Sequence, residues 1–276
     1  MRKPTNRLNL IDDRLFRVAA MDKSFCEELC RVIYNDEKLT VLENEVQWDG
    51  HHLYGKSVML DLKCVLGDGT FVNVEIQKSD NENHQKRIRY NSSVLTTNIT
   101  DPGVDYENVP DVRVVFISKF DPFKAGFTVY HVDRINRETK KIVDNGFSEI
   151  YINAKVKDGS IISELMKIFT EDEFYDFTNF AEISKVKHML KKTEEGRKIM
   201  CGVEQEIFEE GQAEGRAEGR AEGRAEGEAK GKTKGFLESI KKMVENFNVS
   251  ANKAMDVLEI PENERSFYIE KLKEMK

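Results

Sequence analysis

The sequence predicts an α/β protein in which a mixed sheet is flanked by helices and followed by a helical C-terminal extension. Residues 58–66 and 70–76 alternate apolar and polar side chains on either side of Gly67-Asp68-Gly69, as the strands of a β-hairpin do. A helical period follows over 82–98, and residues 112–120 are apolar on both faces, as in a central strand. The order hairpin, helix, strand indicates an α/β sheet with a helical crossover.

Further elements are expected on both sides of this segment. Residues 12–34 show a helical period that restarts near Asp22, which predicts two short helices. Weaker strand patterns that would extend the sheet lie over 127–132 and 147–153. Residues 160–210 have a helical pattern, and its only expected interruptions are two glycines, Gly196 and Gly202.

Composition and charge exclude several classes of protein. The 276 residues include 43 Lys and Arg against 50 Asp and Glu, a net charge of −7, so any nucleic-acid site must be a local basic surface. No apolar run is long enough for a membrane span and no secretory signal is present, which predicts a cytoplasmic protein without membrane partners. The four cysteines are too scattered for a disulfide framework or a zinc site: Cys26, Cys30, Cys64 and Cys201.

Glycine recurs every fourth residue from Gly211 to Gly235, within a tract of Ala, Glu, Arg and Lys. Each internal glycine costs a helix about 1 kcal/mol relative to alanine, and glutamates four residues apart repel each other. Two interpretations are open: a solvated linker, or a helix held by a partner copy. Beyond the tract, apolar periodicity predicts three short helices over 236–276, which we expect to act as an oligomerisation tail.

Three polar side chains interrupt the predicted hairpin: Asp61, Glu75 and Gln77. Opposed residues of an antiparallel pair share a face, so the register decides whether the two carboxylates meet. A three-residue turn, with Gly69 as its left-handed residue, pairs Leu66 with Thr70 and sets Asp61 opposite Glu75. A two-residue turn would place the carboxylates on opposite faces. A metal site therefore requires the three-residue turn.

Two facing carboxylates are ligands for a hard cation such as Mg²⁺, which keeps several waters and binds substrate phosphate through its remaining positions. Gln77 would share their face and could orient a metal-bound water for attack on phosphorus. The spacing alone also fits a second interpretation, in which Asp61 and Glu75 are solvent-side residues of a half-exposed hairpin. The five histidines show no metal-ligand spacing, and none is assigned a catalytic role.

Several segments, in this order, resemble the PD-(D/E)XK nuclease superfamily, and specifically its Rpn family of recombination-promoting nucleases and putative transposases. They are 13–17, Asp61, 73–77, 85–95 and 103–123. The resemblance implies a restriction-endonuclease-like fold, Mg²⁺ or Mn²⁺ held by Asp61 and Glu75, and catalysis by these acids with Gln77. Gln77 stands where most of the superfamily has a lysine, and Leu60 stands where a proline is usual. The implied domains are a nuclease-like domain over 1–210, the repeat over 211–235 and a helical bundle over 236–276.

The helix after the hairpin would contact DNA through its polar side chains. We expect Gln85 and Arg89, four residues apart, to face the scissile phosphate, and Lys86 and Arg87 to bind the DNA backbone. An ordinary solvated helix face is the alternative. Asp13 is a candidate third acid at the metal, or else the N-cap of the first helix.

Two functions compete. The first is a Mg²⁺-dependent DNA endonuclease of mobile-element or recombination type, in which a metal-activated water attacks the phosphodiester. The second is a catalytically inactive nuclease fold that acts as a nucleic-acid-binding or assembly module. The intact acid pair favours the first.

Overall fold

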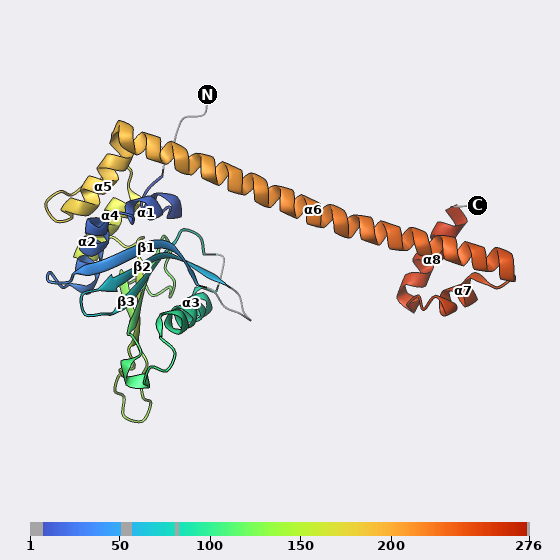
Figure 1. Cartoon of the computed structure of the whole chain (residues 1–276), viewed down its shortest axis with the longest axis horizontal. Coiled ribbons are helices and arrows are strands. Elements are labelled where there is room, and N and C mark those ends of the chain that lie inside the picture. Colours follow the sequence, from blue (N-terminus) through green and yellow to red (C-terminus); the bar gives the residue numbers. More distant parts are fainter. Residues whose placement is uncertain (1–7, 51–56, 81–82, 275–276) are drawn as a thin grey trace. The chain divides into compact units, whose positions relative to one another are not determined.

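A computed structural model describes residues 8–50, 57–80 and 83–274, and it divides into two compact units, Met1–Glu204 and Gln205–Lys276. The first unit contains a six-stranded mixed sheet of order β1-β2-β3-β4-β6-β5 (Figure 1). Strands β1, β2 and β3 are antiparallel neighbours, β3, β4 and β6 are parallel, and β5 is antiparallel to β6. The strands are Val41–Gly50 (β1), Val58–Leu66 (β2), Phe71–Gln77 (β3), Val112–Ser118 (β4), Val129–Val132 (β5) and Phe147–Asn153 (β6).

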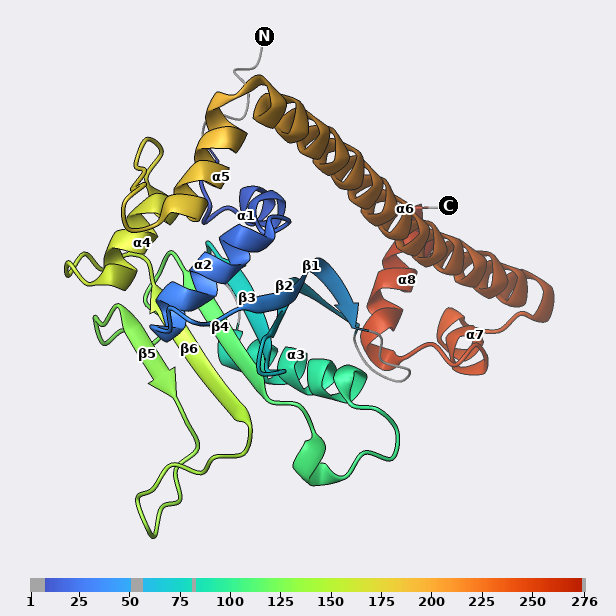
Figure 2. The same cartoon turned by 60° about the vertical axis from the view of Figure 1, so that its left-hand side comes forward.

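Helices cover both faces of the sheet (Figure 2). The crossover helix α3 (His84–Ile99) lies on one face, where Ile88 packs with Val114, Phe116 and Tyr151. The other face is covered by α1 (Asp13–Ala19), α2 (Lys23–Tyr34), α4 (Ile161–Thr170) and α5 (Ala181–Lys192). The predicted restart of the first helical segment is confirmed, since the Asp22 carboxylate accepts the Ser24 and Phe25 N–H groups and caps α2.

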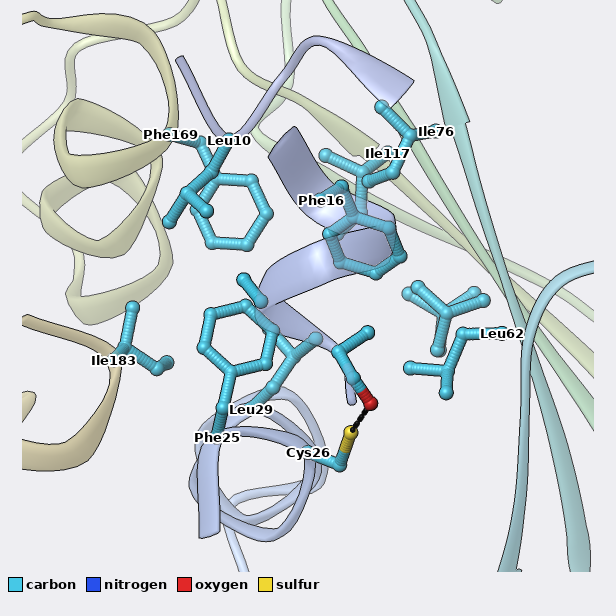
Figure 3. Close-up of a cluster of buried hydrophobic side chains, with 14 of the residues drawn as sticks. Leu10, Phe16, Phe25, Cys26, Leu29, Leu62, Ile76, Ile117, Phe169 and Ile183 are labelled. Carbon is cyan, nitrogen blue, oxygen red and sulfur yellow. Dashed lines mark hydrogen bonds between the residues drawn. The ribbon is translucent and has the colours of Figure 1, made fainter. Parts of the chain in front are cut away.

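The main core lies between the sheet and this second helical layer (Figure 3). Phe16, Phe25 and Phe169 are fully buried, with ring centroids 6.1 to 6.5 Å apart, and Leu62, Ile76 and Ile117 meet this helical layer from the sheet. Three free thiols, those of Cys26, Cys30 and Cys64, are also buried. The sheet is therefore rigidly backed behind the hairpin that carries the acids.

Two features differ from the sequence-based expectations in this unit. Strand β1 was not predicted, because its charged residues break the alternation. The helical region over 160–210 is interrupted at 171–180, between α4 and α5, and again at Thr193, between α5 and α6, and not at its glycines. Gly196 instead allows close approach, since a Cβ there would lie 2.2 Å from the Met189 carbonyl oxygen.

The glycine repeat is part of a single helix, α6 (Glu194–Phe247), so the structure decides the choice between linker and helix in favour of a helix. Alanine, glutamate, arginine and lysine are strong helix formers, and the tract continues a helix that is established at both ends. Ion pairs four residues apart add to this, between Arg224 and Glu228 at 3.3 Å and between Glu226 and Lys230 at 2.8 Å.

The second unit contains the three predicted C-terminal helices: the end of α6, α7 (Ala251–Val257) and α8 (Glu262–Glu274). Ser250 caps α7 by accepting the Lys253 N–H. Met255 and Tyr268 pack on Ile240 in a small core of their own. Met275, expected on the last helix, lies outside the described residues. None of the described helices combines the length and apolar character needed to cross a membrane.

Candidate active site

The turn between β2 and β3 has the three-residue form that a metal site requires. The Leu66 N–H donates to the Thr70 carbonyl at 2.8 Å, and the Gly69 N–H donates to the Leu66 carbonyl at 2.9 Å. Gly69 has a φ of 86°, in the left-handed region that glycine adopts without strain. The resulting register pairs Leu62 with Val74, as predicted.

The β2–β3 ladder ends at that pair, one residue before the two acids. Beyond the ladder, a side chain and not the backbone of β2 bonds to β3: Oδ2 of Asp61 accepts a hydrogen bond from the Ile76 N–H at 2.8 Å. The carboxylate of Asp61 is thereby fixed against β3, beside Glu75, with its second oxygen left for other contacts.

Glu75 is buried, with only 3% of its surface exposed, because α3 covers this face of β3. Its Oε1 accepts hydrogen bonds from the side-chain amides of Asn73 at 3.0 Å and Asn91 at 3.1 Å. Its Oε2 lies 3.6 Å from Nη2 of Arg87. The alternative in which Glu75 is a solvent-side residue of a half-exposed hairpin is therefore wrong.

Burial and mutual repulsion perturb both acids. The pKa of Asp61 is raised to about 8, mainly by burial and then by the charges of Glu75 and Asp13, while the Ile76 N–H and Arg87 oppose the shift. Burial also raises the pKa of Glu75, against the opposing effects of Asn73, Arg87 and Asn91. Such a pair favours a bound cation over two unpaired charges.

Gln77 lies at the end of β3 and its side chain is held at both ends. Its Oε1 accepts from Nη2 of Arg87 at 2.9 Å, and its Nε2 donates to the Ser79 carbonyl at 3.0 Å. The guanidinium of Arg87 thus contacts Gln77 and faces Glu75 at the same time. It brings a positive charge from α3 to the end of β3.

A cavity of about 690 Å³ joins these groups. Asp61, Glu75 and Gln77 line it from the hairpin, and Lys86 and Arg87 line it from α3. Tyr90 and Asn91 complete the α3 side. The structure therefore brings together the three predicted hairpin residues and two of the four candidate DNA contacts.

Gln85 and Arg89 are the other two, and the structure separates them from this cavity. They line a second cavity with Phe123 and Arg134, so the expectation that they face the scissile phosphate is corrected. Residues two positions apart on a helix differ by about 200° in direction, and it is Arg87 and Asn91 that face Glu75. Asn91 was missed as a site residue. The signal in the sequence was that this polar residue shares the buried face of the helix with Ile88.

Asp13 lines the same cavity from the start of α1. The N-cap of this helix is Asp12, so the alternative role of Asp13 as N-cap is wrong. Its Oδ2 pairs with Arg17 at 2.9 Å, whereas its Oδ1 is shielded from solvent and has no hydrogen-bond partner. Asp13 is therefore close enough to act on Asp61 electrostatically and has an oxygen to spare.

These residues fit a hard divalent cation. The donors are carboxylate and amide oxygens, and the orphaned Oδ1 of Asp13 lies on the same cavity. Over the described ranges, no three His, Cys, Asp or Glu side chains are grouped so that they could hold a metal ion, and the acids alone therefore form no ligand cage. Magnesium does not need one, because it is commonly held by one or two carboxylates with water and phosphate as its other ligands. The His84 ring instead lies against the rings of Phe116 and Phe120, with centroids 5.3 and 5.0 Å apart in tilted geometry.

Comparison with known proteins agrees with this geometry. No curated protein and no solved structure matches the chain. A family model described as PD-(D/E)XK nuclease family transposase matches residues 25–201. This range includes strands β1 to β6 and every residue that lines the cavity except Ile11 and Asp13. Members of this superfamily are nucleases that generally use divalent metal ions. The mixed sheet has the restriction-endonuclease-like α/β fold, and the chain belongs to the PD-(D/E)XK nuclease family transposases.

Proposed function

We propose that the protein is a Mg²⁺-dependent DNA endonuclease of mobile-element or recombination type, with Mn²⁺ as a substitute ion. The observation that carries this proposal is the meeting of Asp61 and Glu75 in one cavity, with the pKa of each raised. Asp61 and Glu75 would hold the ion, with Asp13 as a third acid. When bound, the ion supplies charge stabilisation at phosphorus and an activated water.

The protein's own residues have distinct roles in this proposal. Gln77 orients the attacking water by hydrogen bonding, and Arg87 holds Gln77 in place and offsets negative charge beside Glu75. Lys86 binds the DNA backbone at the cavity, and Gln85 and Arg89 contact DNA beyond it, on the next side of α3. Asn73 and Asn91 position Glu75.

The test is nicking of supercoiled plasmid with and without Mg²⁺. We expect Asp61→Asn and Glu75→Gln to abolish nicking, while Glu43→Gln, which changes an exposed acid of β1, leaves it intact. Mg²⁺-dependent cleavage that persists in either site variant contradicts the assignment. A wild-type protein that binds DNA but never cleaves it, with Mg²⁺ or Mn²⁺, would instead be the inactive nucleic-acid-binding module.

The C-terminal unit has a separate proposed role, self-association of the chain. Phe247 and Val257 are exposed there by 71% and 63%, apart from the small core around Ile240. Exposed ion pairs along the repeat are worth only about 0.2 to 1 kcal/mol each and are screened by salt, so apolar contacts would supply most of the association.

A further inference from the structure

The connection between β5 and β6, residues 133–146, forms an arm that extends from the end of the sheet (Figure 2). Its stem is closed by the Val143 N–H, which donates to the Arg134 carbonyl at 2.9 Å. Its tip is built around Asn136, whose Oδ1 accepts from the N–H groups of Glu138 and Thr139 at 3.1 and 2.8 Å. The arm is therefore a defined hairpin.

This hairpin is exposed in the described part of the first unit, although Ile142 and Val143 line a cavity with Ile33 and Tyr34. Residues 131–145 are all exposed. Ile135 and Ile142 face each other across it as an antiparallel bridge, yet they are 60% and 65% exposed. Cross-strand neighbours share one face, so the two form an apolar pair on the surface. Such a pair keeps most of its apolar surface in water, and a partner that covers it would bury that surface.

The charge of the arm indicates the kind of partner. The whole arm contains four cationic side chains and three carboxylates, but all four cations and only one of the acids, Glu138, lie in its outer part, residues 134–141. The whole chain has a net charge of −7, so this excess of positive charge is local. Cationic side chains around an exposed apolar pair suit DNA, because its phosphates are negatively charged and its stacked bases are apolar.

The base of the arm is continuous with the candidate active site. Arg134 lines the second cavity together with Arg89 and Lys86. Lys86 also lines the cavity that holds Asp61 and Glu75. A line of cationic side chains thus leads from the acids across α3 to the arm, through Lys86, Arg89 and Arg134.

We propose that residues 133–146 are a DNA-binding arm that holds the duplex beside the cleavage site. Arg137, Lys140 and Lys141 contact phosphates, and Ile135 with Ile142 enters the minor groove as an apolar wedge. This inference rests on the proposed function, since it assumes that the substrate of the acid pair is duplex DNA.

The experiment measures binding of the full-length protein to fluorescein-labelled duplex DNA by anisotropy, in EDTA, over a range of salt concentrations. Arg137→Ala/Lys140→Ala/Lys141→Ala should weaken binding about tenfold or more and make the slope of log K against log salt shallower by about 2.7. Ile135→Ser/Ile142→Ser should weaken duplex binding with little change in that slope. The same isoleucine variant should lose less affinity for single-stranded DNA of the same sequence than for the duplex.

The matched control, Lys157→Ala/Lys185→Ala/Lys192→Ala, removes three cations from the α4–α5 side and should leave the salt slope unchanged. All substituted arm residues are exposed, and equal melting temperatures will show that the fold is retained. An arm variant with wild-type affinity and slope overturns the proposal. So does an isoleucine variant that loses self-association and keeps its DNA affinity. Because binding is measured without metal, loss of the nuclease assignment and loss of the arm are separate results.

Discussion

Replacement of Asp61 by a side chain that does not titrate should stabilise the metal-free protein, and increasingly so as the pH rises. The pKa of Asp61 is about 8 in the folded chain, against about 3.9 for an unperturbed aspartate. Between these values the unfolded chain is ionised and the folded chain holds the proton, so folding becomes less favourable with rising pH. The cost is about 1.5 kcal/mol at pH 5 and about 4 kcal/mol at pH 7.

Asparagine at position 61 can still accept the Ile76 N–H but does not titrate. We therefore expect Asp61→Asn to gain stability over wild type by about 3 kcal/mol more at pH 7 than at pH 5. Effects of the substitution that do not depend on pH cancel in this comparison. Urea unfolding in EDTA measures it, and the single tryptophan, Trp48, lies on β1, so its fluorescence reports the first unit.

Asp101→Asn, a change in the exposed loop after α3, is the control and should follow wild type at both pH values. Equal pH dependence of wild type and Asp61→Asn would refute the reasoning, because it would mean that Asp61 ionises normally in the folded protein.

Three further outcomes are expected. Gln77→Ala should slow plasmid nicking with little loss of DNA affinity in anisotropy. Gln77→Lys should in addition lower the melting temperature, because its ammonium group would lie beside the guanidinium of Arg87, whose Nη2 is 2.9 Å from Gln77 Oε1 in the wild type. Lys187→Met should lower the free energy of unfolding by about 1 to 3 kcal/mol in urea titrations, since the fully buried ammonium donates to the Ile168, Glu171 and Phe174 carbonyls. A chain ending at residue 211 should keep metal-dependent nicking but lose self-association in sedimentation, and equal sedimentation of the two chains would make the tail a passive extension.

Local rules predicted the hairpin well because its turn residues leave few choices. Gly69 at the third turn position sets the register, and that register brings Asp61 to Glu75. The phase of α3 was harder to assign. Charged residues lie on several sides of this helix, and only the packing of Ile88 and Asn91 shows that Arg87, and not Arg89, faces the acids.

Elements without a strong local pattern were missed or left open. Strand β1 is an edge strand with Glu43, Asn44 and Glu45 between its apolar residues, and pairing with β2 overrides that weak pattern. The repeat could not be assigned from residue propensities because its glycines and its helix formers oppose each other in nearly equal measure. Asp13 reaches the cavity only through the tertiary placement of α1, which no spacing in the sequence encodes.

The three-residue turn at Gly67-Asp68-Gly69 constrains how this protein can evolve. Exposed turns usually tolerate insertions and deletions, and all three of these residues are exposed. Here β2 is also paired with β1, and β3 with β4, so a change of one residue in the turn cannot be absorbed by sliding either strand without breaking a second ladder. A re-pairing in which Gly67 and Thr70 close a two-residue Asp68-Gly69 turn would place Glu75 on the opposite face from Asp61 while leaving both acids in the sequence. Related chains that keep both acids but whose turn favours the two-residue form should therefore not bring the two carboxylates together.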